Sequence, residues 1–276
     1  MRISHNISAM NTYRQYNTNT VATNRSMEKL SSGSRINRAA DDAAGLSISE
    51  KMRSQIKGLT QATRNAQDGV SLLQTAEGAL NEVSDMMVRL KELSVQVQNG
   101  TYSTTDKANI GSEMSALGTA IEEIFDNTKF NGIEVFNTDT TISYGEGAGQ
   151  SITIEDATLA SSTTVDDVKA LVDAAKLADN NYTNAEAVEA TDVESAITQI
   201  NTLRATYGAQ QNQLEHASNN MATTKENLQA AESRVRDVDM AEEMMSYTKN
   251  NILLQAAQAM LAQANAQPQG VLQLLQ

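Results

Sequence analysis

Few residues in this sequence have the type and spacing that catalysis or metal binding requires. The two histidines, His5 and His216, lie far apart in the chain, and neither has a second ligand at a metal-binding spacing such as H-E-x-x-H. Cysteine is absent, which excludes disulfides and thiolate ligands. The sequence therefore predicts no metal site and no cofactor.

The remaining candidates for chemistry are acidic pairs and one glycine cluster. Asp166-Asp167 and Glu122-Glu123 are more typical of solvated helix charges than of a catalytic pair. The cluster Gly145–Gly149 is followed neither by a Lys-Ser/Thr pair nor by a helix, so it indicates a hairpin turn rather than a phosphate loop. We expect no catalytic residues and no enzyme activity.

The pattern that organises the chain is a heptad repeat between Val193 and Val238. Mostly apolar residues recur there at alternating steps of three and four for more than six heptads, which predicts one helix of about 70 Å. The positions are Val193, Ala196, Ile200, Leu203, Tyr207, Gln210, Leu214, Ala217, Met221, Thr224, Leu228, Ala231, Val235 and Val238. A helix of this length needs equally long partners in the same chain.

Two further helices and two hairpins are predicted before this repeat. A second run of apolar residues at helical spacing, or seam, ends at Asn99-Gly100, which is a helix C-cap signal. Thr104 or Thr105 can cap a shorter third helix. Phe130-Asn-Gly-Ile133 predicts a tight β turn at one end of the rod, and alternation over 142–154 predicts a second hairpin. The seam residues are Met52, Ile56, Leu59, Ala66, Val70, Leu73, Ala76, Leu80, Val83, Met87, Leu90 and Val97, then Ile110, Met114, Leu117, Ile121 and Ile124.

Both ends of the chain are predicted to form helices that are not stable alone. The first thirty residues carry a thin apolar stripe with Asn17 and Asn24 in it. After a bend at 234–239, the last helix has apolar residues on more than one face, which indicates burial on more than one side. The apolar positions at the two ends include Ile3, Ile7, Met10, Ile252, Leu254, Leu261, Leu272, Leu274 and Leu275. We expect both ends to become ordered only against partners.

Composition and charge exclude several functions. The formal net charge of -13 argues against a nucleic-acid-binding protein. The first sixty residues hold nine Lys/Arg against four Asp/Glu and the rest twelve against thirty, which suits contact between copies as well as it suits solvated helix faces. No apolar stretch is long enough to span a membrane, and the first residues lack a secretory signal, which alone predicts a cytoplasmic protein.

Several motifs resemble those of the bacterial flagellin family, and together they cover nearly the whole chain. They are LSSGSRIN at 30–37, DDAAG at 41–45, TRNAQDG at 63–69, QTAEGAL at 74–80, FNG at 130–132, LAQAN at 261–265 and VLQLL at 271–275. The outer domains of the family are missing or reduced to residues 155–190. The chain thus resembles a short, core-type flagellin.

The resemblance implies a mainly α fold, a coiled-coil rod with a small β-hairpin region at one end and with paired terminal helices. Residues 1–45 with 235–276 would form the inner core. Residues 46–154 with 185–234 would form the outer rod, with hairpins near 130–136 and 142–154, and 155–184 a short variable insert. The implied function is that of an extracellular subunit of the flagellar filament. It is exported unfolded through the type III apparatus and self-assembles into a hollow tube through the terminal positions given above.

The implied partners are other flagellin subunits, the export apparatus with an export chaperone, the filament cap and the hook-junction proteins, but neither nucleic acid nor membrane. A host Toll-like receptor is a further implied partner, and the matching positions are Arg89, Leu93 and Glu113. We expect Leu93 to be exposed, on the helix face opposite Leu90 and Val97.

Two other classes of protein share parts of this pattern. A hook–filament junction protein has similar terminal patterns, but the unbroken match through 63–80 favours a flagellin. A signalling helical hairpin of the chemoreceptor kind is also heptad-patterned, but it normally needs a membrane anchor and would not carry a β-hairpin.

Overall fold

A computed structural model describes residues 6–145, 149–154 and 188–274, with the side chains of residues 268–274 left out of the description. The expected insert at 155–184 therefore lies outside the described residues, as do Ile3 and Leu275. The chain divides into two compact units. The first joins Met1–Ile56 with Glu226–Gln276, and the second is Lys57–Lys225.

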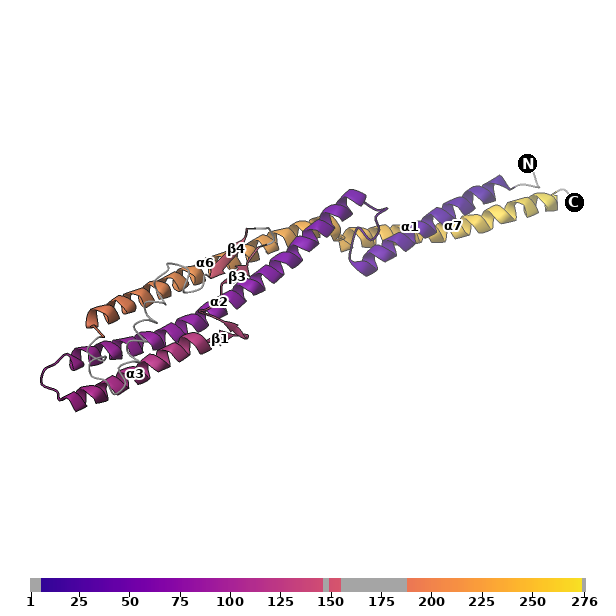
Figure 1. Cartoon of the computed structure of the whole chain (residues 1–276). Coiled ribbons are helices and arrows are strands. Elements are labelled where there is room, and N and C mark those ends of the chain that lie inside the picture. Colours follow the sequence, from indigo (N-terminus) through magenta and orange to yellow (C-terminus); the bar gives the residue numbers. More distant parts are fainter. Residues whose placement is uncertain (1–5, 146–148, 155–187, 275–276) are drawn as a thin grey trace. The chain divides into compact units, whose positions relative to one another are not determined.

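The first unit contains the two terminal helices, α1 (Ile7–Ser32) and α7 (Met240–Leu274), which lie side by side and antiparallel (Figure 1). Three contacts set their register. The Asn6 side-chain amide donates to the Ala264 carbonyl at 2.8 Å, Gln258 donates to the Tyr16 hydroxyl at 3.4 Å, and Lys29 lies 3.8 Å from Glu243. The expected pairing of the terminal helices is confirmed.

Local residue chemistry determines where these helices begin and end. The Asn6 side chain accepts from the Ala9 N–H at the start of α1, and Gly33 ends it with φ 69°, a left-handed conformation that glycine adopts without strain. The predicted bend at 234–239 separates α6 (Ala190–Arg236) from α7. Asp239 begins α7 by accepting from the Ala241 N–H at 2.9 Å.

The segment that follows Gly33 is held against the end of α6. The Arg35 N–H donates to the Arg236 carbonyl at 2.6 Å, and the Val238 N–H donates to the Gly33 carbonyl at 3.1 Å. Arg236 also donates to Glu50 at 2.7 Å, and this hydrogen bond lowers the pKa of the Glu50 carboxyl below its ordinary value. Within the first unit, these contacts connect the segment after α1 and residue Glu50 to the segment between α6 and α7.

Asp42 begins the next helix, α2 (Ala43–Val97), by accepting from the Gly45 N–H at 2.8 Å. A carboxylate at this position was expected, because the helix dipole favours negative charge there.

The second unit is a bundle of α2, α3 (Thr104–Asn127) and α6, which run alongside one another (Figure 1). Its core is formed by the predicted seams. Buried members are Leu73, Ala76, Leu80, Val83, Met87, Leu90 and Val97 of α2, Met114 and Ile121 of α3, and Val193, Ala196, Ile200, Tyr207 and Leu214 of α6. The heptad prediction is confirmed over this unit.

The start of α3 differs from the prediction by one residue. Its N-cap is Ser103, not Thr104 or Thr105. The Ser103 hydroxyl accepts from the Asp106 N–H while the Asp106 carboxylate accepts from the Ser103 N–H, which forms a capping box. The reciprocal pair satisfies two backbone groups, whereas a threonine cap one residue later would satisfy one.

Two small hairpins follow α3. β1 (Lys129–Phe130) pairs with β2 (Ile133–Glu134) across the predicted Asn-Gly turn, where Asn131 has φ 51° and Gly132 φ 82°. The rings of Phe125 and Phe136 meet edge to face with centroids 5.3 Å apart.

The second hairpin joins β3 (Thr140–Ser143) and β4 (Ser151–Ile154), whose isoleucines alternate towards the bundle. It packs at Gly69 of α2 and Leu214 of α6, towards the end of the unit opposite the turn after Val97. The fold is thus mainly α with a small two-hairpin region. Among the described residues, no helix is both long and apolar enough to cross a membrane.

Candidate interaction surfaces

The seam between α1 and α7 holds small and polar side chains. Thr23 and Ser26 are the buried residues of α1 in the described part of the chain, and Ala264 is the buried residue of α7. A seam of this kind removes little apolar area from water, so it contributes little hydrophobic stabilisation. Among the described residues, the terminal pair therefore has no fully buried large apolar side chain, and Leu254 and Leu261 are only half-buried.

Most of the large apolar side chains of the pair are exposed instead. They are Ile7, Met10, Tyr13, Val21 and Met27 on α1, and Met240, Met244, Met245, Ile252, Leu253 and Met260 on α7. Ile7 is 62% exposed and Ile252 66% exposed. Single exposed apolar residues are ordinary, but a run of them along two paired helices marks an interaction surface. We call these residues the outer apolar face.

The predicted assembly residues fall into three groups. Ile7, Met10 and Ile252 belong to the outer apolar face, while Leu254 and Leu261 are half-buried against α1. Ile3 and Leu275 lie outside the described residues, and the side chains of Leu272 and Leu274 are not described. The prediction omitted Tyr13, Leu253 and Met260; for Leu253 and Met260, the apolar residues on more than one face of the last helix were the signal that would have included them.

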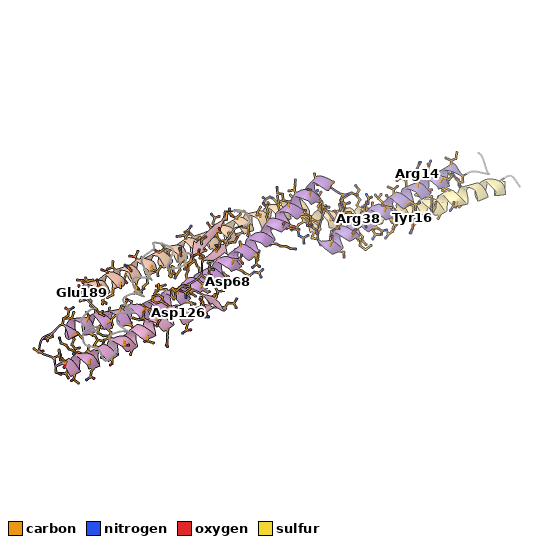
Figure 2. All side chains as sticks on the ribbon, in the orientation of Figure 1. Arg14, Tyr16, Arg38, Asp68, Asp126 and Glu189 are labelled. Atoms are coloured by element: carbon orange, nitrogen blue, oxygen red, sulfur yellow. The ribbon has the colours of Figure 1, made fainter. Side chains whose placement is uncertain are left out.

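A groove of about 770 Å³ runs along α1 beside α7 and carries a local excess of positive charge. Its charged residues are Arg14, Arg25, Lys29 and Glu243, and the last two form an ion pair. Arg14, labelled on α1 in Figure 2, donates to the neutral Asn11 side chain at 2.7 Å. The groove thus offers two guanidinium groups to an approaching carboxylate.

In the second unit, Arg89 lies at the centre of an exposed ion-pair cluster. Its guanidinium donates to Glu113 of α3 at 2.8 and 3.0 Å and to Glu92 of its own helix at 2.8 Å. Hydrogen bonds to Glu92 and Glu113 raise the pKa of Arg89 above its ordinary value. The structure therefore brings two of the three predicted receptor residues into contact.

The third residue, Leu93, corrects a prediction: it was expected to be exposed and is only 1% exposed. It lies three residues after Leu90 and four before Val97, so all three share one helix face. Partners on two sides widen the buried face of α2, since Arg89 reaches α3 and Lys91 pairs with Glu194 of α6 at 3.2 Å. A single heptad seam underestimates burial on such a helix.

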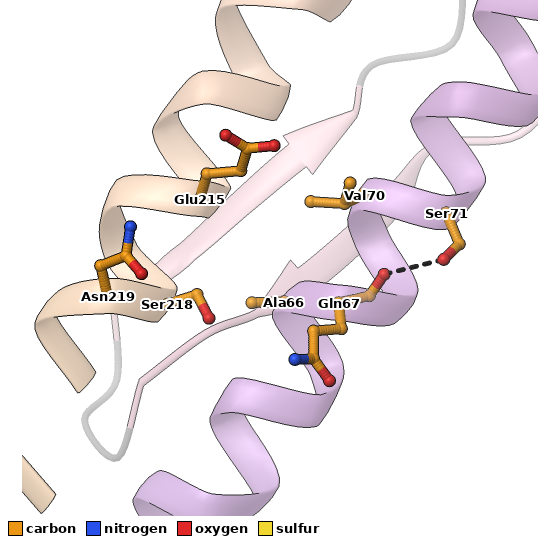
Figure 3. Close-up of a pocket in the computed structure, with 7 residues that line it drawn as sticks. All are labelled: Ala66, Gln67, Val70, Ser71, Glu215, Ser218 and Asn219. Carbon is orange, nitrogen blue, oxygen red and sulfur yellow. Dashed lines mark hydrogen bonds between the residues drawn. The ribbon is translucent and has the colours of Figure 1, made fainter. Parts of the chain in front are cut away.

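A shallow groove between α2 and α6 shows why the second unit offers no reactive site there (Figure 3). It holds about 500 Å³ and is lined by Ala66, Gln67, Val70, Ser71, Glu215, Ser218 and Asn219. The Ser71 hydroxyl donates to the Gln67 carbonyl of its own helix at 3.0 Å, and Glu215 has no second titratable group beside it in the lining. Across the described residues, no three His, Asp or Glu side chains come together as a metal site would require.

Comparison with known proteins gives these surfaces a context. The model of the bacterial flagellin N-terminal helical region matches residues 3–141, and that of the C-terminal helical region matches residues 190–275. The chain is 50% identical to a flagellin of Halalkalibacterium halodurans and 48% identical to a flagellin of Bacillus subtilis, and each alignment covers both chains completely.

A solved structure of a putative flagellar hook-associated protein from Vibrio parahaemolyticus is similar in fold, with a TM-score of 0.57. It is 12% identical, and the match covers 71% of this chain and all of that one. This likeness concerns the fold alone, whereas the flagellin matches extend through the sequence of both terminal regions. The hook-junction and chemoreceptor alternatives are therefore not favoured. The chain belongs to the bacterial flagellin family, whose members are structural subunits of the flagellar filament rather than enzymes.

Proposed function

We propose that this chain polymerises into the flagellar filament, outside the cell, by burying the outer apolar face of α1 and α7 against other copies. The observation that carries the proposal is the arrangement of the terminal pair, whose fully buried residues in the described part are small while most of its large apolar side chains are exposed. Each such side chain gains about 1.5–3 kcal/mol when it is fully buried. In a filament, neighbouring copies of the chain lie at fixed spacing and can cover the outer apolar face of every subunit.

The chain is divided into a part that assembles and a part that folds by itself. Residues 1–45 with 235–276 form the inner core, residues 46–154 with 185–234 form the outer rod, and 155–184 is the variable insert. The division of the chain near Ile56 and Glu226 supports two parts with separate roles. The heptad-packed second unit has its own apolar core, so it is the part that holds its shape before assembly.

Export and termination of the filament require the further partners that are typical of the family. The chain passes unfolded through the export apparatus with an export chaperone, and it meets hook-junction proteins at one end of the filament and the cap at the other. The absence of cysteine and the single proline support passage of an unfolded chain, because neither crosslinks nor many slow isomerisations delay it.

Removal of residues 262–276 tests the assembly proposal. The truncated chain should remain a folded bundle in solution, because the second unit keeps its core, but it should form no filaments. Circular dichroism measures the folding, and electron microscopy with sedimentation measures the assembly of truncated and full-length protein at equal concentration. Filaments of the truncated chain would contradict the proposal, as would a full-length chain that does not polymerise.

A second proposal concerns the receptor contact, and the exposed cluster of Arg89, Glu92 and Glu113 supports it. Because Leu93 is buried, the contact depends on the charged side chains, with Leu93 supporting the helix beneath them. Arg89→Ala should lower the potency of the protein in a Toll-like receptor reporter assay without changing its circular dichroism. Wild-type potency of this variant would exclude the contact.

A further inference from the structure

The described methionines of the terminal helix pair are exposed, whereas those of the second unit are covered. Met10, Met27, Met240, Met244, Met245 and Met260, all on the terminal helix pair, are each 48–66% exposed. In the second unit, Met87, Met114 and Met221 are buried and Met86 is half-buried. Half of the twelve methionines of the chain are thus displayed on two paired helices.

The register of the pair groups the exposed thioethers. The contact between Lys29 and Glu243 places Met27 at the level of Met244 and Met245, and Met240 lies one turn before Met244 on α7. We call Met27, Met240, Met244 and Met245 the methionine cluster. They all belong to the outer apolar face.

An exposed thioether reacts with hydroperoxides. The sulfur attacks the terminal peroxide oxygen, the O–O bond breaks, an S–O bond forms, and the leaving hydroxide or alkoxide takes up a proton as water or alcohol. The sulfur loses two electrons and the peroxide gains them. The product, methionine sulfoxide, is polar, and sulfoxide reductases return it to methionine.

We propose that the methionine cluster is a site of reversible oxidation by hydroperoxides, and that sulfoxides there prevent the free subunit from assembling. This inference rests on the proposed function, because it requires the outer apolar face to be buried between copies. A sulfoxide at a packed contact loses its hydrogen bonds to water without a partner to replace them, which opposes burial. In the filament the same sulfurs are covered by neighbouring copies and escape the oxidant.

The first experiment compares free subunits and filaments treated with dilute hydrogen peroxide. Peptide mass spectrometry should show oxygen added to the methionine cluster of the free subunits faster than to Met86, Met87, Met114 and Met221, and little addition to the cluster in filaments. Treated subunits should then have a critical concentration for assembly at least about tenfold higher, equivalent to about 1.4 kcal/mol per subunit. Incubation with methionine sulfoxide reductases of both stereospecificities should restore the original value.

The second experiment uses two matched variants, since leucine replaces methionine with little change of volume. M27L/M240L/M244L/M245L removes the cluster and should lose clearly less assembly on peroxide treatment than the wild type, because only Met10 and Met260 then keep exposed thioethers on the outer apolar face. M86L/M87L/M114L/M221L removes four thioethers of the second unit and should lose assembly on treatment like the wild type.

Equal assembly of treated and untreated wild-type subunits would overturn the inference while leaving the proposed function intact, because the untreated protein has then polymerised. Failure of untreated wild-type subunits to polymerise would count against the proposed function itself. A treated cluster variant that loses as much assembly as the treated wild type would also overturn the inference, because the damage would then lie outside the cluster.

Discussion

Replacing Gly69 by alanine tests how closely the β3–β4 hairpin packs against the long helices of the second unit. A methyl group at this position would collide with Cδ1 of Ile142 and lie 3.1 Å from its Cγ2 and 3.2 Å from Cδ1 of Leu214. Both neighbours are buried and have little room to move. Overpacking of this kind costs about 1–3 kcal/mol, while alanine in a helix gains about 1 kcal/mol over glycine. We expect Gly69→Ala to lower the free energy of unfolding by up to about 2 kcal/mol.

Gly78 on the same helix provides the control, because nothing lies within 4 Å of the position that its Cβ would take. Gly78→Ala should keep the gain in helix propensity alone and stabilise the protein by up to about 1 kcal/mol. Thermal unfolding followed by far-ultraviolet circular dichroism measures both variants. In a unit of this size, a difference of about 1 kcal/mol shifts Tm by about 2–4 °C.

Equal melting temperatures for Gly69→Ala and Gly78→Ala would refute the close approach of the hairpin, since both changes improve helix propensity equally. The double variant G69A/I142V sharpens the test, because valine lacks the colliding Cδ1 atom. Its loss of stability should be smaller than the two single losses added together, which is the coupling expected of residues in contact.

Two further predictions concern the first unit. Ile252→Asn should change the Tm of the free subunit little, because Ile252 is 66% exposed, but should raise the critical concentration for assembly measured by sedimentation. Lys249→Gln, on the same helix, is its control and should assemble normally. The hydrogen bond from Arg236 lowers the pKa of Glu50, so its stabilising effect is present above the ordinary value of 4.5 and is lost as the pH falls below it. Glu50→Gln should therefore lower Tm at neutral pH but not in acid, and an equal loss at both would show that the charge contributes nothing.

The periodic part of the fold could be predicted from the sequence because one constraint dominates it. In a long helical bundle, a residue is buried if it lies on the helix face that packs against the other helices. A strict heptad repeat of apolar residues identifies that face. Val193, Tyr207 and Leu214 follow that rule. The Asn131-Gly132 turn was predictable for a different reason, since few residues adopt positive φ without strain.

The two misjudged positions each needed an observation beyond the heptad seam. Leu93 was placed on the face opposite Leu90 and Val97, whereas its spacing of three and four residues from them puts it on the same buried face of α2, which contacts both α3 and α6. Ser103 was missed because a capping box depends on the residue three positions later, here Asp106. In both cases the sequence held the necessary signal, namely the spacing of Leu93 from Leu90 and Val97 and the position of Asp106 three residues after Ser103. The structure shows that these signals decide the outcome.

The terminal pair shows why assembly surfaces are hard to read from periodicity. Its last helix is apolar on more than one side, so the sequence does not say which side faces α1. The structure turns the small residues Thr23, Ser26 and Ala264 inward, where the helices can approach closely, and leaves most of the large apolar side chains exposed. The free subunit therefore gains little from pairing its ends, whereas a polymer gains the whole outer apolar face. In the assembly that we propose, folding of the ends and polymerisation are coupled, because contacts with neighbouring copies then supply most of the stabilisation of α1 and α7.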